Sequence, residues 1–199
     1  MKMSICAMLL GFIVLFSGCA ANKPNLQRLT PLPAGKICRV AVLPFIDNSE
    51  FDQGGLVVTR VFTAEFARRG NYMVLPEGDV RNVYRHLRIP PGKMPDVEQI
   101  QILGNQMEAQ LIVVGNIYDM EERTTDGYTA NPVLALNLQL LDPKSGNIIW
   151  TTYHRREGAQ YRTFMHFGLI NTISELARRV SQEILEQWFS AGGLKPCSE

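Results

Sequence analysis

The sequence predicts an α/β sandwich of two or three layers, built on a mixed sheet. Apolar, β-branched runs alternate with segments of helical periodicity through the first half, two strands joined by turn residues follow, and a long amphipathic helix comes last. The expected order is strand, helix, strand, helix, helix, strand, two hairpin strands and helix. Parallel crossovers therefore come first and an antiparallel edge comes later.

The first half of the domain contains the predicted crossovers. Residues 37–45 form a buried apolar strand that stops near Pro44. Apolar residues at helical spacing predict a helix over residues 58–66, which ends near Gly70. A short strand over residues 72–75 and a second helix from about residue 79 come next.

The second half begins with a third helix, for which Asp96 is a suitable N-cap. Residues 111–118 form a near-continuous apolar run, which predicts a central strand covered on both faces. Polar residues 119–127 are expected to form a loop.

The predicted hairpin pairs residues 134–140 with residues 148–154. Leucines alternate with small or polar residues in the first strand, as in a strand with one solvated face. The intervening residues 142–146 contain Pro143 and Gly146, which favour a turn. Apolar residues at helical spacing over 170–188 predict the final helix.

The N-terminus has the pattern of a bacterial lipoprotein signal. Lys2 is followed by an apolar run over residues 5–16, and two small residues precede Cys19. The run is short for a membrane span, which needs about 20 residues; an uncleaved anchor helix with an incidental cysteine is the alternative. Cys19 is therefore the predicted site of lipidation, which anchors the chain to a membrane without crossing it. Ala20 stands where an Asp would favour the inner membrane, so we expect the periplasmic face of the outer membrane.

Four segments follow from this assignment. Residues 1–18 are the expected signal peptide and residues 19–35, which contain several Pro and Asn, the lipidated flexible tether. Residues 36–190 form a single α/β periplasmic domain, and residues 191–199 a C-terminal tail.

The charge balance argues against nucleic-acid binding, and the cysteine content leaves two cysteines that could form a disulfide. The chain has 20 Lys and Arg against 19 Asp and Glu, and Lys2 leaves with the signal, so no basic face for nucleic acid is expected. Cys38 and Cys197 remain in the mature domain, where the periplasm permits a disulfide. The alternative is a buried Cys38 and a free thiol at Cys197.

Catalytic signals are poor. The chain has no nucleophile elbow and no phosphate-binding loop motif. His86, His154 and His166 lie on different predicted elements without zinc-ligand spacing, so each is expected to be a surface or packing residue. We expect no enzyme activity, no metal and no cofactor.

Two groups of residues are candidate interaction surfaces. The first is acidic and is either a solvated loop or a patch that attracts a cationic polymer: Asp119, Glu121, Glu122 and Asp126. The second is aromatic and either packs on the sheet or faces a partner or a membrane: Tyr161, Phe164, Phe167 and Trp188.

Three motifs resemble the CsgG/LpoB/PelC-like group of periplasmic outer-membrane lipoproteins. They are residues 39–45 as the opening strand, residues 109–117 as the central strand and residues 141–150 as the hairpin. The resemblance covers roughly residues 36–187, without the long insertions from which CsgG builds its barrel, and in size the chain is nearest to the PelC-like members.

The resemblance implies a non-catalytic module. Members of this group assemble secretion pores, support polysaccharide export or activate peptidoglycan synthases, and several form rings. We therefore expect a homo-oligomeric accessory of an envelope export or assembly machine, for exopolysaccharide. The alternative is a monomeric regulator of a peptidoglycan synthase.

Overall fold

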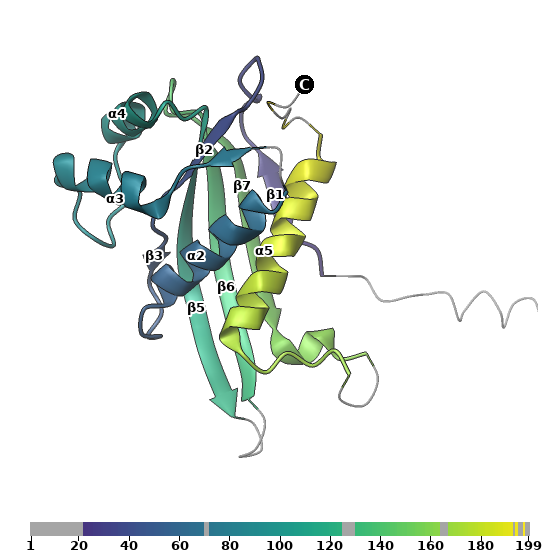
Figure 1. Ribbon diagram of the computed structural model, residues 1–199. Coiled ribbons are helices and arrows are strands. Elements are labelled where there is room, and N and C mark those ends of the chain that lie inside the picture. Colours follow the sequence, from purple (N-terminus) through teal and green to yellow (C-terminus); the bar gives the residue numbers. More distant parts are fainter. Residues whose placement is uncertain are drawn as a thin grey trace, which may run out of the picture.

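The computed structural model describes residues 22–69, 72–124, 130–163 and 167–192, together with Leu194 and Cys197. The predicted signal peptide, Cys19, Asp126 and Phe164 lie outside the described residues. Figure 1 shows the described chain as one mixed sheet flanked by helices.

The sheet has strands in the order β1-β7-β6-β5-β2-β4, with the short β3 pairing with β5. β2 is parallel to β4 and β5, whereas β5, β6, β7 and β1 form antiparallel pairs. The strands are β1 (Asn25–Arg28), β2 (Arg39–Val42), β3 (Ile46–Asp47), β4 (Met73–Val74), β5 (Leu111–Thr124), β6 (Ala130–Leu141) and β7 (Ile148–Glu157).

The helices cover the two faces of the sheet unequally. α2 (Gly54–Ala67) and α5 (Ile173–Ser190) pack side by side on one face, and α3 (Glu77–His86) and α4 (Val97–Met107) lie against the other face near β2 and β5 (Figure 1). The molecule therefore has three layers at the β2 end and two at the β7 end. This confirms the predicted α/β sandwich with a mixed sheet, a C-terminal hairpin and a long final helix.

Two apolar clusters correspond to these layers. In the larger cluster, four leucines at alternate positions of β6 face α2 and α5: Leu134, Leu136, Leu138 and Leu140. The smaller cluster lies under α3 and α4, where Ile112 and Val114 of β5 point to the opposite face. Successive residues of the first half of β5 are thus buried on both faces, as its continuous apolar run predicts.

Local sequence explains individual elements. Asp96 accepts a hydrogen bond from Gln99 N at 2.8 Å, and the Gln99 side chain accepts one from Asp96 N at 3.0 Å, which is the capping box at the start of α4. Gly115 lies in the middle of β5 because a Cβ there would be 2.7 Å from the Phe45 ring.

Two predicted segments differ in the structure. The tether was expected to run to residue 35, but residues 25–28 form β1, an edge strand paired with β7. This short edge strand can form through backbone hydrogen bonds to β7 alone, without an apolar pattern of its own. Leu26 is its only apolar residue and packs on the core. The predicted loop over residues 119–127 is wrong for residues 119–124, which continue β5 and pair with β6.

Candidate functional site

The N-terminal segment meets α5 along a groove whose lining residues are mostly polar or charged. The groove encloses about 460 Å³ between residues 22–24 and the second half of α5. Figure 1 shows β1, which follows residues 22–24, beside α5. Its lining residues are Asn22, Lys23, Pro24, Arg156, Glu183, Glu186, Gln187 and Ser190. The described chain therefore begins in this groove.

The floor of the groove is a hydrogen-bonded ionic cluster centred on Glu183. Arg156 donates from Nε to Oε2 at 3.0 Å and from Nη2 to Oε1 at 2.8 Å. His154 Nε2 lies 2.5 Å from Oε2, and the Tyr161 hydroxyl donates to Oε1 at 3.0 Å. The Arg156 guanidinium also lies over the Tyr161 ring, 4.8 Å from its centroid.

Secondary structure brings these four side chains together. His154 and Arg156 are two residues apart in β7, so both point to the face that α5 covers. Tyr161 ends the 3₁₀ helix η1 (Gly158–Tyr161), which directly follows β7. Glu183 is on the adjoining side of α5.

The cluster fixes the charge of Glu183. Burial acts to raise the pKa of this carboxyl, but the hydrogen bonds from His154, Arg156 and Tyr161 outweigh burial and lower the pKa to about 2. Burial also raises the pKa of the Tyr161 hydroxyl, and the neighbouring carboxylate adds to that rise. Glu183 is thus a permanent anion at neutral pH and holds α5 to β7.

Sequence reasoning missed this cluster. His154 was expected to be a surface or packing residue, and the structure places it in the core with 1% of its side chain exposed. The signal in the sequence was the pair His154 and Arg156, two residues apart and therefore on one face of β7, the face that also carries Trp150. Its acidic partner lies 27 residues after Arg156, so spacing alone could not identify it.

The predicted aromatic surface is divided by the fold. Of the two alternatives for these aromatics, Trp188 follows the first: it is fully buried against Trp150 and Phe62 and does not face a partner or a membrane. Tyr161 is half-buried in the ionic cluster, whereas Phe167 is 72% exposed. The Phe167 carbonyl oxygen accepts a hydrogen bond from Thr163 N at 2.9 Å.

The predicted acidic patch is also divided. Glu122 Oε1 accepts a hydrogen bond from Ile173 N at 2.6 Å, at the N-terminus of α5, where an anion is favoured. Asp119 is 4.0 Å from Arg155, with which it shares the opposite face of the sheet. Because strand alternation separates Glu122 from Asp119 and Glu121, these three do not form one acidic surface.

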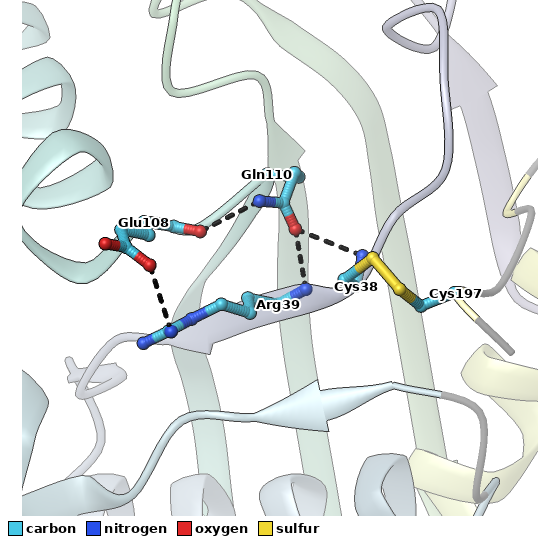
Figure 2. Close-up of a disulfide and its surroundings, with 5 residues drawn as sticks. All are labelled: Cys38, Arg39, Glu108, Gln110 and Cys197. Carbon is cyan, nitrogen blue, oxygen red and sulfur yellow. Dashed lines mark hydrogen bonds and ion pairs between the residues drawn. A yellow bond between two sulfur atoms is a disulfide. The ribbon is translucent and has the colours of Figure 1, made fainter.

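The opposite end of the chain is fastened to β2 by a disulfide. Figure 2 shows the bond between Cys38 and Cys197, with their Cα atoms 4.6 Å apart. Gln110 secures the same stretch of backbone, since its Oε1 accepts hydrogen bonds from Cys38 N at 3.0 Å and Arg39 N at 2.7 Å. The tail that follows α5 therefore returns to the first parallel strand of the sheet.

The described residues hold neither a metal site nor a membrane-spanning helix. They contain no group of three or more His, Cys, Asp or Glu side chains arranged to hold a metal ion. Among the helices of the same residues, none combines the length and the apolar character needed to cross a membrane.

Comparison with known proteins identifies the fold. No protein-family model and no curated protein matches the sequence. Among solved structures, the PelC dodecamer from Paraburkholderia phytofirmans has a TM-score of 0.55 at 14% identity, over 81% of this chain and 94% of the PelC chain. Lipoprotein GNA1162 from Neisseria meningitidis has a TM-score of 0.51 at 13% identity, over 77% of this chain and 99% of that chain. The domain therefore shares its fold with both.

Proposed function

We propose that this protein is a lipoprotein anchored at Cys19 to the periplasmic face of the outer membrane. In this proposal it is a non-catalytic, homo-oligomeric accessory of an envelope export machine, for exopolysaccharide. The observation that carries the proposal is the combination of a lipoprotein signal with a fold that spans 94% of the PelC chain, which forms a dodecamer.

The second fold relative supports the anchored part of the proposal. GNA1162 is itself a lipoprotein, and the likeness covers 99% of its chain. Both relatives are thus matched as whole domains. The export role comes from the resemblance of the strand and hairpin motifs, and fold alone does not decide it.

The chemistry of the groove supports a non-catalytic role. A general acid or base acts best when its pKa lies near the working pH, but the pKa of Glu183 is about 2. Glu183 also accepts hydrogen bonds from three side chains, so its oxygens are engaged in holding α5 to β7. The best-formed ionic cluster of the described residues is therefore suited to a structural task.

Deletion combined with sedimentation tests the proposal. The purified lipidated protein should sediment as a closed oligomer, and deletion of the gene should reduce surface polysaccharide, with recovery on complementation. A monomer in solution, together with unchanged surface polysaccharide, would contradict it. Copurification with a peptidoglycan synthase and a rise in that enzyme's rate would instead favour the monomeric regulator.

A further inference from the structure

The short segment between Cys19 and the groove beside α5 limits how far the groove can lie from the membrane. This step rests on the anchor at Cys19 proposed above. Only two residues lie between Cys19 and Asn22, the first lining residue of the groove, and these three Cα–Cα steps span at most about 11 Å. The headgroup layer on each side of a bilayer is about 5–8 Å thick. The groove mouth is therefore within reach of the phospholipid headgroups.

The pairing of β1 with β7 keeps the domain close to the membrane, because it shortens the free segment after Cys19. A free tether of residues 19–35 would have let the domain move up to about 55–60 Å from the membrane. Instead, Asn25–Arg28 is paired with β7, and Asn22 Nδ2 donates to Arg155 O at 3.4 Å. The chain is thus attached to the sheet from its first described residue, and the end of the domain that carries residues 22–24 must face the bilayer.

The groove presents one cation and one anion that the fold does not use. Lys23 and Glu186 are exposed, and neither forms an ion pair with another described residue. In contrast, Arg156 and Glu183 neutralise each other in the floor. Gln187 Oε1, on the same wall, is buried without a hydrogen-bond donor in the described structure.

We infer that this groove binds the headgroup of an ammonium-bearing phospholipid, such as phosphatidylethanolamine, from the leaflet that holds Cys19. Lys23 pairs with the phosphate, and the primary ammonium donates hydrogen bonds to the exposed Glu186 carboxylate. A primary ammonium suits this wall better than a quaternary one, because it has hydrogen-bond donors. The contact fixes the orientation of the domain on the membrane.

Native mass spectrometry of the full lipidated protein in mild detergent tests this inference. The protein is titrated with phosphatidylethanolamine, phosphatidylcholine and phosphatidylglycerol, and the fraction carrying one bound lipid is measured. We expect phosphatidylethanolamine to bind about two- to fivefold more tightly than the other two, the range for one partly exposed ion pair. Glu186→Gln should abolish the preference for the ammonium lipid, and Lys23→Gln should weaken binding of all three.

A matched control lies on the opposite face of the sheet. Lys93, four residues before α4, and Glu98, in its first turn, are also exposed. Lys93→Gln and Glu98→Gln therefore change the same charges away from the groove and should leave the lipid preference intact. Equal binding of the three lipids, or an equal effect of the control variants, would overturn the headgroup site. The same spectra weigh the protein itself, so a mass without acyl chains would overturn the anchor separately.

Discussion

Trp188 donates its indole N–H to the hydroxyl of Thr152 at 2.7 Å, and both side chains are completely buried. This bond joins the last turns of α5 to the middle of β7. It satisfies the one polar atom of a large apolar residue, which allows the indole to lie in the core. Its position between Gln187 and Ser190 also makes it a support for the wall of the groove.

Thr152→Val should destabilise the fold by about 1–3 kcal/mol, because it leaves the buried indole N–H without an acceptor. Trp188→Phe removes the donor and leaves a space in the core, and it should reduce the free energy of unfolding by about the same amount. The double variant should lose less than the sum of the two, since the shared bond is counted once. Urea unfolding of the four proteins measures the coupling, and strictly additive losses would show that the bond contributes nothing.

The Cys38–Cys197 disulfide should be a major source of stability. It closes a loop over a sequence separation of 159 residues, for which chain entropy gives up to about 5 kcal/mol and typical disulfides give about 2–4 kcal/mol. Reductant should therefore lower the urea midpoint of the wild-type protein markedly. The double variant Cys38→Ser, Cys197→Ser is the control: it should start at the lower midpoint and not respond to reductant. An unchanged wild-type midpoint would contradict the prediction.

Acid should weaken the α5–β7 contact through Glu183. The pKa of this carboxyl is lowered in the folded protein from 4.5 to about 2, so its stabilisation is complete above about pH 5 and is lost as the pH falls towards 2. Glu183→Gln should reduce the free energy of unfolding by about 2–3 kcal/mol at pH 7. The difference from the wild type should shrink to near zero by about pH 2.

Glu186→Gln provides the comparison for this pH dependence. Glu186 is on the same helix and exposed, without an ion pair to another described residue, so its replacement should change stability little at any pH. If Glu183→Gln gave the same flat difference, the ionic cluster would not stabilise the fold.

The core elements could be predicted from sequence because their patterns are local. The alternating leucines of β6, the capping box of Asp96 and Gln99, and the helical spacing in α5 each identify an element without knowledge of its neighbours. Their order was enough to predict the mixed sheet.

The remaining features depend on contacts distant in sequence. β1 has almost no apolar signal and exists because β7, more than 120 residues later, offers a free edge. Glu122 was expected either in a solvated loop or in an acidic patch, but its carboxylate accepts a hydrogen bond from Ile173 N at the start of α5, across a separation of 51 residues. The sequence left the burial of Trp188 open, because an aromatic residue near a helix end has the same sequence pattern whether it is buried or exposed. The hydroxyl that accepts the indole hydrogen bond in the core belongs to Thr152, which is in β7.

The measurement that tests the central claim most directly is the membrane partition of Cys19→Ser. The wild-type protein should sediment with outer membranes and carry acyl chains by mass spectrometry. Cys19→Ser should be released from membranes yet keep the wild-type urea midpoint and the Cys38–Cys197 disulfide, because residue 19 precedes the folded domain. Retention of a fully functional Cys19→Ser protein on the outer membrane would contradict the account.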